Sequence, residues 1–171
     1  MNPQTLTKIE IEKIQFKNNT LSTPLFIKLE DVVVPFTIKK FDKNWSLSLN
    51  NVDPTKLKEI EQSFRQRVGE TDFEFKTNVI EDQEGKFRPS IRVKIPVKND
   101  KFDFDCYDTN GKEIEMNEKL IVEYFKKGTH LNVIIQLNCY VWEAKNMYGI
   151  TYTLVQVKQL EDKKVFKKCV V

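Results

Sequence analysis

Hydrophobic and polar residues alternate along the stretch from Phe87 to Lys98, with the two-residue period of a β-strand. One face carries the apolar positions, which are Phe87, Pro89, Ile91, Val93, Ile95 and Val97. The other face is polar and cationic, and it consists of Arg88, Ser90, Arg92, Lys94, Pro96 and Lys98. The pattern therefore predicts a strand with one face in the core and a positively charged face outside.

Further β-rich segments lie on both sides of this stretch. Three runs separated by charged or turn residues occupy positions 25–49, and a shorter alternating segment covers 102–107. A long alternating run from Leu131 to Trp142 is followed by a turn and by the returning run ITYTLVQVKQL, so this part predicts a β-hairpin. Residues 1–23 contain only a short alternating piece, which indicates an N-terminal arm or edge strand.

Two segments have helical periodicity instead. Asp53 followed by Pro54 is a typical helix start, and Gly69 supplies the stop. Between them, apolar residues recur at three- and four-residue spacing, at Leu57, Ile60, Phe64 and Val68. A shorter helix is predicted over 117–126.

Strands that precede a short helix, followed by a closing hairpin, are typical of a five-stranded barrel with a helical plug. We therefore predict a mainly β protein with short helices (α+β): an OB-fold, a five-stranded Greek-key barrel with additional N-terminal strands and one longer helix. The predicted organisation is an arm over 1–23, an OB-fold domain over 24–160, and a basic C-terminal tail or truncation point over 161–171.

Composition narrows the class of protein. The chain has 171 residues, of which 40% are hydrophobic, and it contains no apolar run near the ~20 residues that span a bilayer. Its N-terminus lacks the apolar stretch of a signal peptide, and its three cysteines are widely spaced beside a single histidine. These features predict an intracellular, reduced protein with no membrane association, no metal and no cofactor.

The net charge is only +3, but the charges are segregated along the chain. Positions 70–84 are predominantly acidic, whereas 86–101 are predominantly basic. A basic segment of this kind permits nucleic-acid binding without requiring it. A strand face that is simply solvated by Lys and Arg is the competing interpretation.

The chain resembles a known family in the order of several segments: GKFRPSIRVKIPV, FDFDCYDTNGKEI, a short helix, GTHLNVIIQLNCYVW and YGITYTLVQVKQL. This order, with PLFIKL, VPFTIK and WSLSL upstream, is similar to OB-fold single-stranded DNA-binding proteins of large double-stranded DNA viruses, such as African swine fever virus. It also resembles, more distantly, the T7-type phage single-stranded DNA-binding proteins. The resemblance spans roughly residues 24 to 160 and implies a role in viral DNA replication, recombination or repair, in the host cytoplasm or nucleus. Phage and bacterial proteins of this class usually end in an acidic tail, whereas this chain ends LEDKKVFKKCVV.

A single strand offers phosphates and unstacked bases, so its binder needs a cationic groove and aromatic faces. Phosphate contacts are predicted for Arg88, Arg92, Lys94, Lys98 and Lys145, and base stacking for Tyr140, Trp142 and Tyr148, with Trp45 and Tyr152 as weaker candidates. If the four strand cations all bind phosphates, the salt slope of log affinity should be near −3, from about −0.7 per phosphate. The competing interpretation packs Tyr140 and Trp142 beneath the N-terminal strands.

Single-stranded DNA is the expected partner, with RNA and other replication proteins as further candidates and weaker binding to duplex. Enzymatic alternatives are less well supported. Asp103 and Asp105 share a strand face and could hold a divalent metal with Asp108 or Glu113, but a solvated strand face before a turn is the favoured explanation. No phosphate-binding loop, GxSxG, HExxH or CxxC motif occurs. The remaining alternative is a non-enzymatic protein-interaction module built on the same β-barrel.

Overall fold

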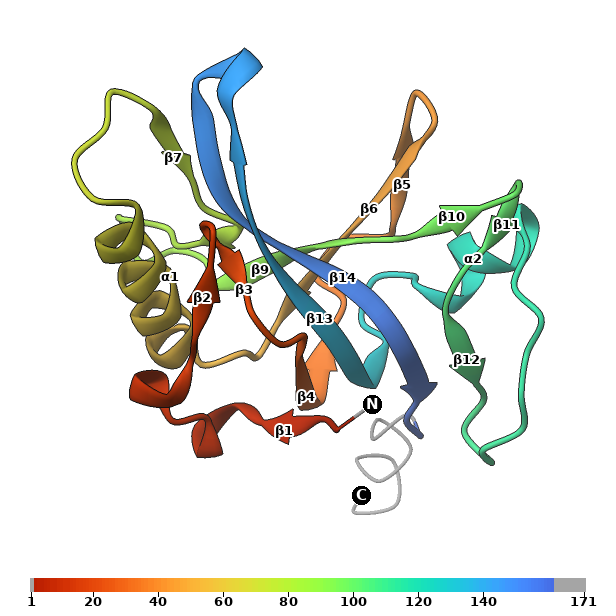
Figure 1. The fold of residues 1–171 in the computed structure, drawn as a ribbon. Coiled ribbons are helices and arrows are strands. Elements are labelled where there is room, and N and C mark those ends of the chain that lie inside the picture. Colours follow the sequence, from red (N-terminus) through yellow and green to blue (C-terminus); the bar gives the residue numbers. More distant parts are fainter. Residues whose placement is uncertain (1, 162–171) are drawn as a thin grey trace.

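Five strands form a closed barrel in the computed structural model, which describes residues 2–161. The predicted C-terminal tail lies outside the described residues except for Glu161. The barrel strands are β4 (Leu25–Val33), β6 (Asn44–Asn50), β9 (Ser90–Lys94), β13 (His130–Trp142) and β14 (Met147–Gln159). Figure 1 shows β13 and β14 as the two longest, strongly curved strands.

The order of these strands is that of an OB-fold. β4 pairs with β13 and β13 with β14, both antiparallel, while β14 pairs with β9 in parallel. β9 then pairs with β6 antiparallel, and the register pair Val33 and Asn50 joins β6 back to β4. A Greek-key barrel of five strands is thereby closed, as the sequence predicted.

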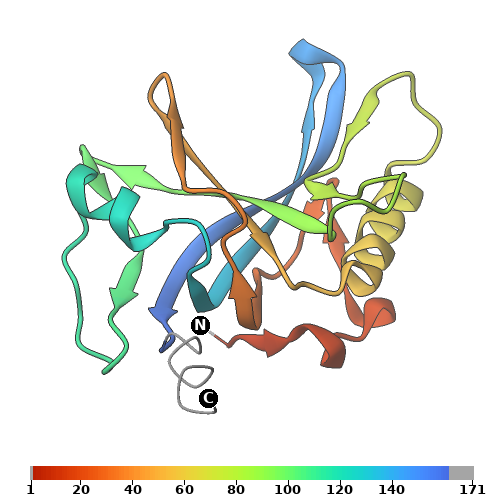
Figure 2. The same cartoon turned by 180° about the vertical axis from the view of Figure 1, so that it is seen from behind.

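Shorter strands and helices lie around the barrel (Figures 1 and 2). β5 (Lys39–Phe41) forms a hairpin with β6, and β1 (Gln4–Thr5) pairs with β4. The remaining short strands are β2 (Phe16–Lys17), β3 (Thr20–Leu21), β7 (Glu74–Lys76), β8 (Val79–Ile80), β10 (Val97–Lys98), β11 (Lys101–Phe102) and β12 (Asp105–Tyr107). Three short 3₁₀ helices cover Leu6–Lys8, Ile11–Lys13 and Glu143–Lys145.

Helix α1 (Pro54–Val68) follows the predicted pattern closely. The Asp53 carboxylate accepts a hydrogen bond from the Thr55 backbone amide, and Gly69 ends the helix with φ of 79°. Phe64, on the apolar face, stacks on Phe16 of the N-terminal segment with a centroid distance of 5.8 Å. The helix therefore covers one flank of the barrel and holds the N-terminal segment against it (Figure 1).

Helix α2 (Glu118–Tyr124) confirms the second predicted helix but ends two residues earlier. The Asn117 side chain caps it by accepting from the amides of Lys119 and Leu120. Neither α1 nor α2, the two α-helices within residues 2–161, is long and apolar enough to cross a membrane.

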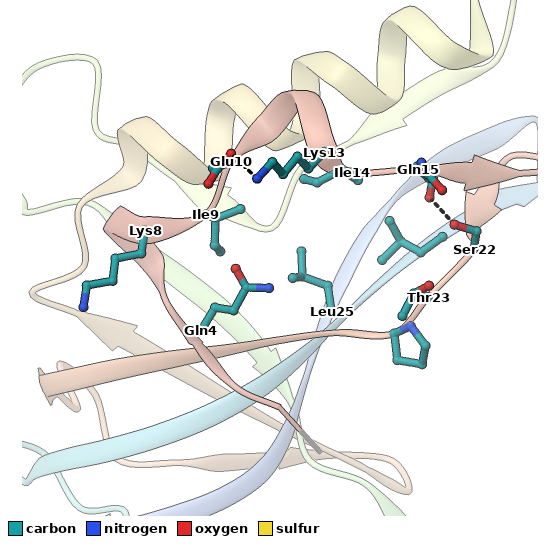
Figure 3. Close-up of a pocket in the computed structure, with 12 residues that line it drawn as sticks. Gln4, Lys8, Ile9, Glu10, Lys13, Ile14, Gln15, Ser22, Thr23 and Leu25 are labelled. Atoms are coloured by element: carbon teal, nitrogen blue, oxygen red, sulfur yellow. Dashed lines mark hydrogen bonds and ion pairs between the residues drawn. The ribbon is translucent and has the colours of Figure 1, made fainter.

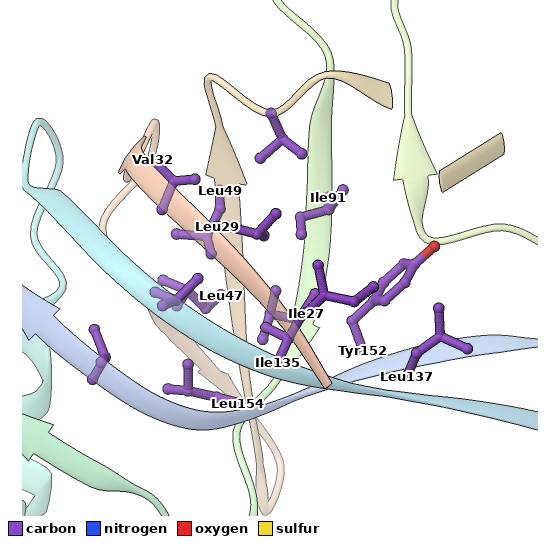
Figure 4. Close-up of a cluster of buried hydrophobic side chains, with 14 of the residues drawn as sticks. Ile27, Leu29, Val32, Leu47, Leu49, Ile91, Ile135, Leu137, Tyr152 and Leu154 are labelled. Carbon is purple, nitrogen blue, oxygen red and sulfur yellow. The ribbon is translucent and has the colours of Figure 1, made fainter. Parts of the chain in front are cut away.

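The core fills the barrel with inward side chains from every barrel strand (Figure 4). On β13 and β14 these include Ile135, Leu137, Tyr152 and Leu154, all of which are almost fully buried. The register between the two strands shifts after Ile134, which is a β-bulge that bends the hairpin. The bend lets the lower half of the hairpin close the barrel while its upper half projects outward (Figure 1).

The strand predicted over Phe87 to Lys98 is wrong in its extent. Only Ser90–Lys94 forms β9, and β10 is a separate two-residue strand. Phe87, predicted as core, is 71% exposed, and Val97 is 49% exposed. Asp82 explains the N-terminal limit, because its carboxylate accepts hydrogen bonds from the amides of Lys86 and Phe87 and holds that segment in a loop.

Gly149 provides a stability test, because any side chain here would meet the β7 backbone. A Cβ would collide with the Lys76 carbonyl oxygen and lie within 3.0 Å of the Tyr140 hydroxyl oxygen. We expect Gly149→Ala to lower the free energy of unfolding by about 1–3 kcal/mol, the usual cost of overpacking. Urea denaturation of Gly149→Ala beside Thr151→Ala, a half-buried position two residues away on the outward face, provides the measurement and its control. Equal stability of the two variants would contradict the close β7 to β14 packing.

Candidate nucleic-acid interface

Two hairpins project from the barrel with β9 crossing between their bases (Figures 1 and 2). One is the β5–β6 hairpin, which turns at Asp42 with φ of 54°, and the other is the upper part of β13–β14, which turns at Asn146 with φ of 51°. Turn residues of this kind tolerate positive φ because their short polar side chains interact with the local backbone. The outward faces of β6, β9 and β14 form the floor between the two hairpins.

Two adjoining hollows lie on this floor. The first is lined by Phe36, Thr37, Lys39, Phe41, Ser46, Ser48 and Arg92. The second is lined by Asn44, Trp45, Ser46, Asn78, Arg92, Val93, Lys94, Thr151 and Tyr152. Because Ser46 and Arg92 belong to both hollows, we treat them as one surface and call it the hairpin groove.

Arg92 and Lys94 supply positive charge to the hairpin groove. Both lie on the exposed face of β9, directly opposite Ser48 and Ser46 of β6. Lys94 also neighbours Thr153 of β14 through the parallel pairing. Neither cation forms a salt bridge with any described residue, and no Asp or Glu lines the groove. An anion entering the groove would therefore meet uncompensated positive charge and hydroxyl groups.

The other predicted cations are more dispersed. Arg88 precedes β9, and Lys98 lies in β10, beyond the other end of β9. Both side chains are exposed, and neither lines one of the two hollows. Lys145 lies at the tip of the β13–β14 hairpin, with its Nζ 5.7 Å from the centre of the Trp142 ring. The structure thus brings together two of the four strand cations and pairs Lys145 with an aromatic side chain.

Trp142 is half-exposed at the end of β13, on the same face as Tyr140, Gln136 and Asn138. This face points away from the core, whose side chains come from the intervening positions. Tyr140 is less accessible because it lies directly across from Gly149, and burial raises the pKa of its hydroxyl. The interpretation that packs Trp142 beneath the N-terminal strands does not agree with its 50% exposure.

Tyr148 cannot stack on a base as predicted. It pairs with Val141 on the inward face of the hairpin, is only 4% exposed, and contacts the rings of Phe64 and Phe75 at centroid distances of 5.9 and 5.2 Å. The two weaker candidates are also buried: Trp45 packs edge-on against Phe102, and Tyr152 is 1% exposed. Trp45 and Tyr152 alternate with polar neighbours, and Tyr148 lies between Met147 and Gly149, but all three rings lie on the buried faces of their strands.

Phe36 and Phe41 are groove aromatics that the sequence analysis did not identify. Phe36 is 62% exposed and precedes the β5–β6 hairpin, and Phe41 is 66% exposed and lies in it. The available signal was the basic cluster of Lys39, Lys40 and Lys43 around Phe41, next to a turn. Exposed aromatic rings therefore stand on both hairpins, Phe41 on one and Trp142 on the other.

A second pocket lies beside the N-terminal segment, at the opposite end of the barrel from the hairpin tips (Figure 3). Its apolar walls come from Ile9, Ile14 and Leu25, and its charged residues include Glu10 and Lys13, which form an ion pair of 2.9 Å. Among residues 2–161, no three His, Cys, Asp or Glu side chains gather as a metal site would require. The hairpin groove is therefore the better candidate for a functional surface.

Comparisons with known proteins agree with the fold. The chain matches no protein-family model and no curated protein sequence significantly. Among solved structures, the C-terminally truncated single-stranded DNA-binding protein of bacteriophage Enc34 aligns with a TM-score of 0.54 at 13% identity, covering 89% of this chain and 97% of that chain. The single-stranded DNA-binding protein gp2.5 of bacteriophage T7 aligns with a TM-score of 0.52 at 13% identity, covering 80% and 91%.

A structure of the Enc34 protein in complex with single-stranded DNA also aligns, with a TM-score of 0.50 at 13% identity over 89% of this chain and 97% of that chain. At such low identities, the similarity establishes the fold. The chain therefore has an OB-fold, and the solved structures that share this fold with it include phage single-stranded DNA-binding proteins. The predicted likeness to T7-type proteins is confirmed at this level, whereas the likeness to the African swine fever virus group is not confirmed.

The different exposure of the two tryptophans can be tested by fluorescence. We expect Trp45→Phe, which leaves only the exposed Trp142, to emit at longer wavelength and to be quenched strongly by iodide, an anion that Lys145 attracts. Trp142→Phe, which leaves the buried Trp45, should emit at shorter wavelength and resist quenching. Similar quenching of the two variants would contradict the placement of both side chains.

Proposed function

We propose that this protein binds single-stranded DNA in the hairpin groove without sequence preference. The observation that carries the proposal is the combination of two unpaired cations and several hydroxyls on an acid-free floor with an exposed aromatic ring on each hairpin. Proteins that bind single strands in this manner use a positive groove for the backbone and aromatic faces for the bases. The fold shared with the phage proteins, one of them solved with single-stranded DNA, supports the same function.

In the proposed complex, Arg92 and Lys94 bind phosphates at the centre of the groove. Arg88, Lys98 and Lys145 extend the positive surface for a longer strand, and Lys39 adds a cation from the β5–β6 hairpin. Trp142 and Phe41 stack on bases, with Tyr140 and Phe36 as neighbouring aromatic surfaces. Every nucleotide offers a phosphate and a base that can stack, so this mode of binding does not distinguish one base sequence from another.

Duplex DNA should bind more weakly, because its bases are already stacked on each other and cannot meet the aromatic rings. The proposed function needs no catalysis and no cofactor, because it consists of non-covalent binding that protects exposed strands. A role in viral DNA replication, recombination or repair, inside the host cell and beside other replication proteins, is the biological setting that we propose.

The direct test is a titration with a fluorescent single-stranded oligonucleotide and with the matching duplex at several salt concentrations. We expect preference for the single strand and an affinity that falls steeply with salt. Arg92→Ala combined with Lys94→Ala should make the slope of log affinity against log salt shallower by about 1.4, from about 0.7 per phosphate.

The matched control for this variant is Arg67→Ala combined with Lys112→Ala, which removes the same charge from exposed positions outside the hairpin groove. It should retain the original salt slope. No single-strand binding by the unaltered protein at low salt would refute the proposal. An equal change of slope in both double variants would show that only the net charge matters.

The aromatic contacts make a separate prediction. Trp142→Ala and Phe41→Ala should each weaken single-strand binding by about 1–3 kcal/mol, the usual contribution of one stacked base. Trp142 is half-exposed and Phe41 is 66% exposed, so thermal stability should change little. Fluorescence anisotropy measures the affinity, and Phe87→Ala, which removes an exposed ring outside the groove, is the control. Unchanged affinity of Trp142→Ala would exclude this residue from the binding surface.

A further inference from the structure

A second groove, of opposite charge, lies between β11 and the segment that leads into α2. Its apolar surface comes from Phe102, Phe104, Ile114 and Met116, which are partly buried against the core. Phe104 packs on Phe125 with a centroid distance of 6.2 Å, so this surface is fixed to the barrel. We call this surface the acidic groove because of the side chains that surround it.

Asp100, Glu113 and Glu115 line the acidic groove and are exposed. None of these three forms an ion pair with a described residue. Glu118, a fourth acid at its edge, is held by Lys40 at 2.8 Å, and Lys101 is the only cation among the lining residues. The acidic groove therefore suits a segment that carries several positive charges and a few apolar side chains.

The chain itself contains such a segment. Residues 162–171 have the sequence DKKVFKKCVV, with four lysines, one acid and apolar residues at Val165, Phe166 and Val170 among others. The sign of its charge opposes that of the acidic groove, and its apolar residues are of the kind that the phenylalanine surface would bury. The proposed complex in the hairpin groove uses no residue of this segment.

The connection between the segment and the acidic groove is short. β14 ends at Gln159, and Lys158 pairs with Tyr107 of β12. Tyr107 in turn pairs with Glu113, which lines the acidic groove. Two strand spacings of about 4.8 Å therefore separate the end of β14 from the edge of this surface, and ten extended residues reach at most about 36 Å.

We propose that residues 162–171 dock in the acidic groove, with lysines beside Asp100, Glu113 and Glu115 and with Phe166 on the Phe102 and Phe104 surface. Tethering raises the effective concentration of the segment at the groove, so contacts that are individually weak suffice. Docking would also keep four lysines away from the hairpin groove while the protein is free. The inference does not depend on the proposed DNA binding.

Paramagnetic relaxation can test this docking in the full chain. Cys106 and Cys139 are buried, which raises the pKa of their thiols to about 11 and about 12, so a nitroxide reagent at neutral pH is directed to Cys169. We expect the label to broaden amide signals of residues 100–104 and 113–117 selectively. At about 1 M salt, where the Debye length is only about 3 Å, the broadening should decrease.

Glu113→Gln combined with Glu115→Gln should largely remove the broadening. Glu70→Gln combined with Asp72→Asn, which neutralises two exposed acids after α1, should leave it unchanged. Broadening elsewhere, at no amide, or equally in both variants would overturn the proposal. Broadening that appears only between labelled and unlabelled copies in a mixed sample would also overturn it, in favour of a second copy as the occupant. DNA is absent from this experiment, so its failure would not affect the proposed function.

Discussion

The pairing of β13 with β14 is the interaction on which the rest of the structure depends. It extends from Leu131 opposite Gln159 to Trp142 opposite Met147, with one register shift between Ile134 and Ile135. Its lower half pairs with β4 on one side and β9 on the other, which closes the barrel. Its upper half extends beyond the barrel as a projecting hairpin (Figure 1). One hairpin therefore builds both the core and one wall of the hairpin groove.

The alternation of side chains along this hairpin separates stability from function. Inward positions such as Leu137 and Tyr152 are buried, whereas the outward positions Gln136, Asn138 and Trp142 remain accessible. The parallel pair of Thr153 with Lys94 then brings the cationic face of β9 beside the outward face of β14. Because the two faces of a strand are independent, substitutions at outward positions can change the hairpin groove while the core is preserved.

Much of the fold could be predicted from the sequence because it rests on local periodicity and capping. Asp53, Pro54 and Gly69 set the limits of α1, and the alternation from Leu131 to Trp142 identified β13. The individual site residues were less predictable. Tyr148 and Trp142 lie close together in the sequence, on either side of the hairpin turn. The register of the two strands places the Tyr148 ring on the buried face and the Trp142 ring on the exposed face. The basic cluster around Phe41 was a weak signal, since the exposure of this ring depends on how the β5–β6 hairpin projects from the barrel.

Positive and negative side chains occupy separate surfaces in this fold. Arg92 and Lys94 face a groove without acids, while Asp100, Glu113 and Glu115 gather beside α2. A polyanion near the protein would be attracted by the first surface and repelled by the second. The ion pair of Lys40 with Glu118 joins the β5–β6 hairpin to α2 between these two regions. A chain with a net charge of only +3 can thus present a groove that cations line without acids, because several of its acids lie at another surface.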